Sequence, residues 1–106
     1  IGAKLIKMQK NQANEFYKIH EKKPFFQELT KFMCSGQVAV LALEKENAVE
    51  EWRKTIGATN PSEADDGTIR KLYATSLGEN AVHGADSDEN AEREIYFFFS
   101  ESDLLL

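Results

Sequence analysis

The sequence contains one uninterrupted run of six apolar residues, from Val38 to Leu43. A run of this length without polar alternation is typical of a β-strand covered on both faces, so it predicts a strand in the interior of a sheet. Residues 3–9 give a weaker strand signal, because lysine and apolar residues fall on both alternating faces. Most of the remaining chain has helical periodicity. The sequence therefore predicts an α+β fold that is rich in helix and has few strands.

Four segments have apolar residues at the spacing of amphipathic helices, and residues 68–74 are expected to form a further short helix. Each is predicted to begin at a residue type that is common at helix N-termini. These residues are Asn11, Pro24, Asn47, Thr68, and either Asp86 or Ser87. The first helix is expected over residues 11–20, and the third is expected to have a capping box formed by Asn47 and Glu50. Residues 80–84 are expected to hold a short strand or turn. Residues 58–67 lack an apolar period and are predicted to form a long loop.

The length of 106 residues indicates a single domain with its own core, and the net charge is −5. General binding to a nucleic-acid backbone needs clustered basic residues, so this charge disfavours a nucleic-acid partner. No apolar run is long enough to span a membrane, and we expect no membrane partner. Cys34 is the single cysteine, which excludes an internal disulfide and favours a reducing, cytoplasmic location. Small anionic ligands remain compatible, because a few arginines in one cleft set the local potential.

His83 is the residue most suggestive of chemistry, because it lies on a predicted tight turn next to Gly84 and just before the last helix. Glu94 falls beside the apolar stripe of that helix, where an acid is costly to bury unless it is paired. A hydrogen bond from His83 would satisfy Glu94, fix the tautomer of the imidazole and leave the other ring nitrogen free to act as a nucleophile. Two alternatives stay open. His83 can be a turn histidine satisfied by its neighbours, and Glu94 can pair with Arg93 or Lys71 at the surface.

Arg53 and Arg70 flank the predicted 58–67 loop and can bind phosphate oxygens, with hydroxyl contacts from Thr59 and Thr68. The alternative is that both are solvated arginines on helix surfaces. The common glycine-rich phosphate-binding loops are absent, so side chains would have to bind a nucleotide. Phe25 could stack on a base, although periodicity equally allows both Phe25 and Phe26 to lie in the core. His20 is expected to pack or to form a local hydrogen bond, because no metal-ligand set surrounds it.

Taken together, these motifs resemble the nucleoside diphosphate kinase family over essentially the whole chain. The principal motif is Asn80-Ala81-Val82-His83-Gly84-x-Asp86-Ser87, followed by Glu94. Four others precede it in family order: Phe16-Tyr17-x-x-His20, Pro24-Phe25-Phe26, Gly57-Ala58-Thr59-Asn60-Pro61 and Gly67-Thr68-Ile69-Arg70. Five ordered motifs at family spacing make this a specific signal. The resemblance implies a ferredoxin-like antiparallel sheet with helices packed on it.

The resemblance implies an enzyme that moves the terminal phosphate of a nucleoside triphosphate to a nucleoside diphosphate by a ping-pong mechanism. His83 would be phosphorylated, Glu94 would orient it, and Tyr17 would lie near its ring. The nucleotide would be held by Phe25 and Leu29 at the base, Asn80 at the sugar, and Arg53, Thr59 and Arg70 at the phosphates. Magnesium would be bound mainly by the nucleotide phosphates, and no protein metal site is expected. The family also implies a homo-oligomer, either a tetramer or a hexamer.

Three departures from the family pattern bear on these expectations. The family's first strand, with its Lys-Pro-Asp motif, and its first helix have no counterpart, so residues 1–106 are expected to be one N-terminally incomplete domain of a longer polypeptide. Without that strand, unpaired backbone groups in the sheet would each cost about 1–3 kcal/mol, and we expect the fragment not to fold stably alone. Ala85 replaces the usual serine and is expected to weaken phosphorylation. Lys71-Leu72-Tyr73 stands where an acidic residue is common. A catalytically weak family member acting as an oligomeric binding module is the alternative function.

Overall fold

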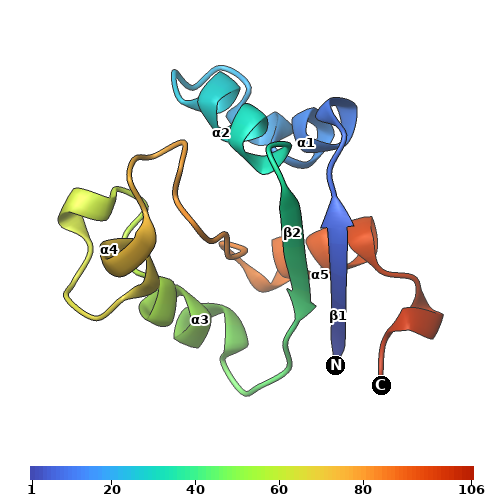
Figure 1. The fold of residues 1–106 in the computed structure, drawn as a ribbon. Helices are drawn as coiled ribbons and strands as arrows, with labels where there is room; N and C mark the ends of the chain where they lie inside the picture. Colours follow the sequence, from blue (N-terminus) through green and yellow to red (C-terminus); the bar gives the residue numbers. More distant parts are fainter.

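The computed structural model of the chain describes all residues from Ile1 to Leu106 and contains a two-stranded antiparallel sheet (Figure 1). Strand β1 covers Gly2–Lys7 and strand β2 covers Gln37–Ala42. In their register Gly2 lies opposite Ala42 and Lys7 opposite Gln37. Both predicted strands are therefore present, and the α+β class is confirmed.

Five α-helices and three short 3-10 turns make up the remaining regular structure. The helices are α1 (Lys10–Phe16), α2 (Phe26–Met33), α3 (Ala48–Ile56), α4 (Ile69–Tyr73) and α5 (Asp88–Phe98). The 3-10 turns are Lys18–His20, Pro61–Glu63 and Glu101–Asp103. Helices α1 and α2 connect the two strands and lie beyond one end of the sheet, α5 runs behind the strands, and α3 and α4 lie to one side of β2 (Figure 1). No helix combines the length and apolar character that a membrane crossing would need.

The prediction that both faces of the 38–43 run are covered is wrong for this structure. Val40 and Ala42 pack against Phe98 and Phe99 at the end of α5, whereas Leu41 on the opposite face is 54% exposed. The side chains of a strand point alternately to the two faces of the sheet, and α5 covers only one of them. A cavity of about 590 Å³ with mostly apolar walls, Leu41 among them, lies beside β2.

The apolar stripes predicted for the first two helices face the core. The larger core cluster joins α1, α2 and the segment after β1 through the buried side chains of Met8, Ala13, Phe16, Tyr17, Phe26 and Leu29. The smaller cluster joins β2 to the C-terminal segment through Ala42, Phe99 and Leu104. Tyr17, which is expected to lie near the ring of His83, is thus also a core residue.

Several predicted element ends differ from the structure. Helix α1 is capped by Gln9 rather than Asn11, and the expected 11–20 helix ends at Phe16, with a separate 3-10 turn after Tyr17. Asn47 has φ of 55°, a left-handed conformation, and its side chain makes no capping bond, so the predicted capping box is absent. Pro24 precedes α2 rather than opening it. Of the two forms expected for residues 80–84, a turn is present and a strand is not, so the sheet has no third strand.

Two caps behave as predicted, and one alternative is resolved. The hydroxyl of Thr68 accepts a hydrogen bond from the backbone N–H of Lys71 and caps α4. Of the two candidates for the cap of α5, Ser87 is the one used, because its hydroxyl accepts from the N–H of Asn90 at 3.1 Å. Asp86 instead accepts a bond from the Asn90 side chain at 2.6 Å. The start of α5 is therefore fixed by three polar side chains, immediately after the histidine turn.

Candidate active site

His83 lies on an irregular segment whose backbone turns sharply just before it. Ala81 has φ of 67°, which is uncommon for a residue with a Cβ, and the N–H of Val82 bonds to the carbonyl of Asn80 at 2.8 Å. Gly84 follows His83 and lies against α3, where an added Cβ would come within 2.7 Å of the Trp52 ring. A side chain at position 84 would therefore push this turn away from the helix. The turn presents the imidazole between α1, α3 and α5.

The side chains of His83 and Glu94 are directly hydrogen bonded, with Nε2 of the ring 2.5 Å from Oε1 of the carboxylate. An ionised carboxylate can only accept, so Nε2 carries the proton and Nδ1 keeps its lone pair. The His83 side chain is 30% exposed and that of Glu94 15%. Arg93 lies farther from Glu94, at 3.9 Å from Oε2. Histidine is thus the main partner of Glu94, and the ring remains open to a ligand.

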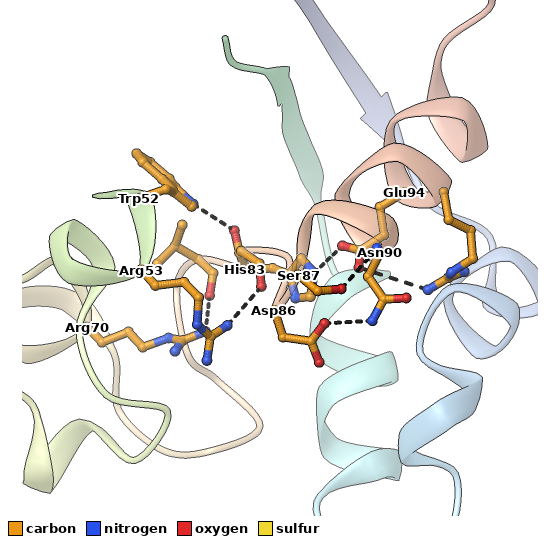
Figure 2. Close-up of polar contacts among 11 residues, drawn as sticks. Trp52, Arg53, Arg70, His83, Asp86, Ser87, Asn90 and Glu94 are labelled. Atoms are coloured by element: carbon orange, nitrogen blue, oxygen red, sulfur yellow. Dashed lines mark hydrogen bonds and ion pairs between the residues drawn. The ribbon is translucent and has the colours of Figure 1, made fainter. Parts of the chain in front are cut away.

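Three consecutive carbonyls around His83 accept hydrogen bonds from side chains of α3 and α4 (Figure 2). Arg70 donates to the carbonyl of Val82 at 3.0 Å and Trp52 donates to that of His83 at 3.3 Å. Arg53 makes the longest of these contacts, to the carbonyl of Gly84 at 3.4 Å. Figure 2 shows these donors on one side of His83, with Ser87, Asn90 and Glu94 of the α5 region on the other.

Arg53 and Arg70 are the two guanidinium groups of the site, and neither forms a salt bridge. Arg70 is buried and also donates to the carbonyl of Gly57 at 3.2 Å, whereas Arg53 is exposed. Burial lowers the pKa of Arg70 from its ordinary value, and the positive charge of Arg53 lowers it further. Two like charges without a paired carboxylate favour the binding of an anion between them. The predicted pair is therefore brought together beside His83.

Tyr17 supplies a buried hydroxyl group next to the histidine. Its ring meets the His83 ring edge-on, with centroids 5.5 Å apart, and the residue is 2% exposed. The Tyr17 hydroxyl has no hydrogen-bond partner. Burial raises the pKa of Tyr17 well above its ordinary value, and the charge of Glu94 raises it further. The hydroxyl therefore stays protonated and is an unused hydrogen-bond donor beside His83.

The predicted base site lies where α2 begins. Phe25 is half-buried, whereas Phe26 is buried in the core, so only Phe25 keeps ring surface for stacking. Leu29 was expected beside the base, but it is 2% exposed and lies within the larger core cluster. It supports the packing beneath Phe25 and does not itself offer a surface to a ligand. Asn80 is buried, and Thr59 is exposed in the loop after α3.

His20 approaches the site from the 3-10 turn after α1. Its ring centroid is 5.9 Å from that of Phe25, and its Nδ1 atom is buried without a partner. Burial lowers the pKa of His20, and the positive charge of Lys23 lowers it further. His20 thus packs on Phe25, as the sequence suggested. No cluster of three or more histidine, cysteine or acidic side chains is arranged to hold a metal ion.

Trp52 is the contact residue of the site that the sequence reasoning did not identify, because its helical spacing assigns it to the buried stripe of α3. It is only half-buried, and its indole N–H is bonded to the histidine turn. The sequence did contain one indication that Trp52 lies near the site, because it directly precedes Arg53. Thr68, proposed as a ligand contact, uses its hydroxyl to cap α4 and to donate to the carbonyl of Asp65 at 2.7 Å.

Comparison with known proteins gives one consistent family. The family model described as "Nucleoside diphosphate kinase" matches residues 1–104. The nucleoside diphosphate kinase of Methylobacterium radiotolerans is 55% identical over 98% of this chain and 74% of its own length, and that of Hyphomonas neptunium is 56% identical over the same shares. Among solved structures, the nucleoside diphosphate kinase of Aquifex aeolicus superposes with a TM-score of 0.91 at 40% identity, covering 98% of this chain and 76% of its own.

A second solved structure adds a ligand to the comparison. The nucleoside diphosphate kinase of Halobacterium salinarum, in complex with CDP, superposes with a TM-score of 0.85 at 36% identity. The match covers 99% of this chain and 70% of that one. The fold built from β1, β2 and the five helices is therefore shared with proteins that carry the family's name, which supports the ferredoxin-like α+β assignment.

Proposed function

The chain belongs to the nucleoside diphosphate kinase family, and we propose that it transfers the terminal phosphate of a nucleoside triphosphate to a nucleoside diphosphate through a phosphohistidine at His83. Because it belongs to this family, the chain is a nucleotide phosphotransferase. One observation carries the finer proposal. The Nε2 atom of His83 is bonded to Glu94 while Nδ1 makes no hydrogen bond, and two unpaired guanidinium groups stand beside the same turn.

The proposed reaction has two matching halves. In the first, the lone pair of His83 Nδ1 attacks the terminal phosphorus of the triphosphate, and the bond from that phosphorus to the bridging oxygen breaks, which releases the diphosphate. In the second, a terminal oxygen of another diphosphate attacks the same phosphorus and the P–N bond breaks. The ring gains positive charge while it carries the phosphoryl group, and the Glu94 carboxylate stabilises that charge.

The surrounding residues have positioning and electrostatic roles in this proposal. Arg53 and Arg70 would bind phosphate oxygens, with Thr59 adding a hydroxyl contact, and Tyr17 would donate its unpartnered hydroxyl beside the transferred group. Phosphoryl transfer depends mainly on such positioning and charge stabilisation, so a site built from arginines around one nucleophile suits it. The base would stack on Phe25, and Asn80 would contact the sugar. Every base has a π face that can stack on an aromatic ring, so we expect low base specificity.

Magnesium would enter with the nucleotide. The side chains near His83 provide no carboxylate set for a metal, and the acid nearest to the histidine, Glu94, is already bonded to it. When bound, the ion would neutralise phosphate charge and hold the phosphate chain in a reactive shape. The arginines and Tyr17 would then contact the phosphate oxygens that the metal leaves free.

The alternative, a catalytically weak family member that serves as an oligomeric binding module, is not favoured. Its support in the sequence is Ala85 in place of serine, but the histidine–glutamate pair and both arginines are present in one site. We also propose that the protein is a homo-oligomer, a tetramer or hexamer, located in the cytoplasm. Exposed apolar side chains such as Leu41 on the sheet and Leu72 and Tyr73 on α4 support self-association.

Labelling with [γ-³²P]ATP tests the proposed function. The full-length protein should acquire an acid-labile, alkali-stable label that transfers to added nucleoside diphosphate. The two histidines of the chain provide the control, because His83→Asn should abolish the label and His20→Asn should retain it. Absence of label from the wild-type protein, or retention of label in His83→Asn, would contradict a phosphohistidine at this position.

A further inference from the structure

We propose that Trp52 is a positioning residue that holds the backbone of His83 while the neighbouring arginines engage phosphate. The inference rests on the proposed function, because it assigns Arg53 and Arg70 to the nucleotide. It adds to that function a residue whose role is to fix the nucleophile and not to contact the substrate.

The backbone carbonyls of the histidine turn accept hydrogen bonds from side chains of α3 and α4. Residues 81–85 belong to no helix or strand, so the carbonyls of Val82, His83 and Gly84 have no regular backbone partners. Side-chain N–H groups of Arg70, Trp52 and Arg53, respectively, occupy them instead. The contacts at the carbonyls of Val82 and His83 are partly buried, where a carbonyl without a partner costs free energy, so their two donors help to fix where the turn lies. Figure 2 shows the indole and both guanidinium groups reaching this segment.

The three donors differ in what else they can bind. Arg53 is exposed, carries a full charge and makes a single long contact at 3.4 Å, so a phosphate oxygen competes effectively for it. Arg70 shares its two terminal nitrogens between the carbonyls of Gly57 and Val82, and its Nε is unsatisfied. The indole of Trp52 has one N–H and no charge, and that N–H is already directed at the carbonyl of His83. Of the three, Trp52 is the donor that a nucleotide does not draw away.

Steric contact adds to the hydrogen bond. A Cβ placed on Gly84 would lie 2.7 Å from Cδ1 and 3.0 Å from Nε1 of Trp52, and 3.0 Å from Cδ1 of Ile56. The backbone of Gly84 therefore packs directly against the indole ring of Trp52 on α3. The same side chain both bonds to the His83 carbonyl and supports the following residue, so it limits motion of the turn along two directions.

The test uses the full-length protein and begins with a measurement on the wild type. The chain has one tryptophan, so a ¹H–¹⁵N spectrum has one indole signal from this region to follow. We expect the Trp52 indole proton to be protected from hydrogen exchange, and to stay protected when the site is saturated with ADP. Exchange at the rate of a free indole, with or without ADP, would overturn the proposal. This measurement needs no variant and does not depend on catalysis.

The variant Trp52→Phe keeps an aromatic ring and removes the donor. We expect single-turnover phosphorylation of His83 to slow by roughly two- to tenfold, the loss expected for one neutral hydrogen bond, with the Kd for ADP changed by less than about twofold. Amide exchange at residues 82–85 should become faster. Thr55→Ala on the same helix is the matched control, because the Thr55 hydroxyl bonds only to the carbonyl of Glu51. It should retain the wild-type rate and exchange pattern.

The outcomes separate the two proposals. A wild-type protein that labels normally, together with a Trp52→Phe variant that has wild-type rate and exchange, refutes the positioning role and leaves the kinase function intact. A wild-type protein that takes no label refutes the proposed function, and the exchange measurements still decide whether Trp52 holds the turn. A Trp52→Phe variant that reacts more slowly but shows no change in amide exchange at residues 82–85 would also count against the positioning role.

Discussion

Nε2 of His83 and Oε1 of Glu94 lie 2.5 Å apart, although the two residues belong to different elements, an irregular turn and helix α5. The bond fixes the ring tautomer and directs Nδ1 away from the helix. It also explains why an acid is tolerated at a largely covered position of α5, because a buried carboxylate needs a partner. The five predictions below follow from this pair and from the groups around it.

Replacing Glu94 with glutamine should slow phosphorylation of His83 more than it lowers stability. The variant keeps the side-chain shape but removes the charge that stabilises the phosphorylated imidazole. A hydrogen bond to a charged group contributes about 1.5–3 kcal/mol, which corresponds to a roughly 10- to 100-fold loss of rate. Single-turnover labelling measures it, and Glu92→Gln, at an exposed position of the same helix, should keep the wild-type rate. Equal rates for Glu94→Gln and the wild type would rule out this role for the carboxylate.

Arg53→Lys and Arg70→Lys should differ in their effect on stability. Both variants should raise the KM for nucleotide, because lysine cannot bind two phosphate oxygens as a guanidinium fork does. Arg70 is buried and bonds to the carbonyls of Gly57 and Val82, so its replacement should also lower the free energy of unfolding by about 1–3 kcal/mol. Arg53 is exposed with one long contact, and its replacement should change stability by less than about 0.5 kcal/mol. Urea unfolding checks both values, and equal destabilisation would contradict the assigned contacts.

Tyr17→Phe should change how stability depends on pH. The pKa of Tyr17 is raised in the folded state, so the folded protein keeps a proton that the unfolded chain releases above about pH 10. The unfolded state then binds fewer protons, and the free energy of unfolding falls as pH rises above that value. Tyr17→Phe should lose this part of the decline, while Tyr73→Phe, at an exposed position, should retain it. Urea titrations between pH 8 and 11 measure the difference, and parallel curves for wild type and Tyr17→Phe would exclude it.

The same Tyr17→Phe variant should phosphorylate His83 more slowly at pH 8. The hydroxyl has no partner in the protein, so its removal should leave stability at that pH unchanged or slightly higher. A fall in rate without a fall in stability would therefore assign the hydroxyl to the reaction. An unchanged rate would assign Tyr17 to the core alone.

Ala85→Ser should increase the rate of His83 phosphorylation. Position 85 is half-buried between Gly84 and Asp86, next to the histidine turn, and the family pattern has serine there. The added hydroxyl would supply a hydrogen bond near His83 and Glu94, and a neutral bond of this kind corresponds to roughly a two- to tenfold gain. Labelling of the variant under single-turnover conditions measures it. No gain in rate would contradict the expectation that Ala85 weakens phosphorylation.

Local sequence chemistry determined much of the fold and of the candidate site. The apolar spacing of Phe16 and Tyr17 gave the buried face of the first helix, and Thr68 capped α4 as its residue type suggested. The position of Glu94 on its helix suggested a pairing with His83 beside other possible partners, and the two side chains are hydrogen bonded in the structure. Each of these depends on a short-range rule, either helical periodicity or a hydroxyl that reaches a nearby backbone N–H.

Tertiary contacts decided the rest, because burial and partner choice depend on segments far apart in the sequence. The apolar run of β2 could not reveal that Leu41 would stay exposed, since only the position of α5 decides which face is covered. Asn47 is a residue type that often caps helices, but its backbone is left-handed and its side chain makes no capping hydrogen bond. Leu29 lies in the core, and Trp52 reaches a carbonyl 31 residues away in sequence. The sequence therefore specified which groups can react, and the folded chain decided which of them meet, because contact between distant residues is set by packing and not by spacing.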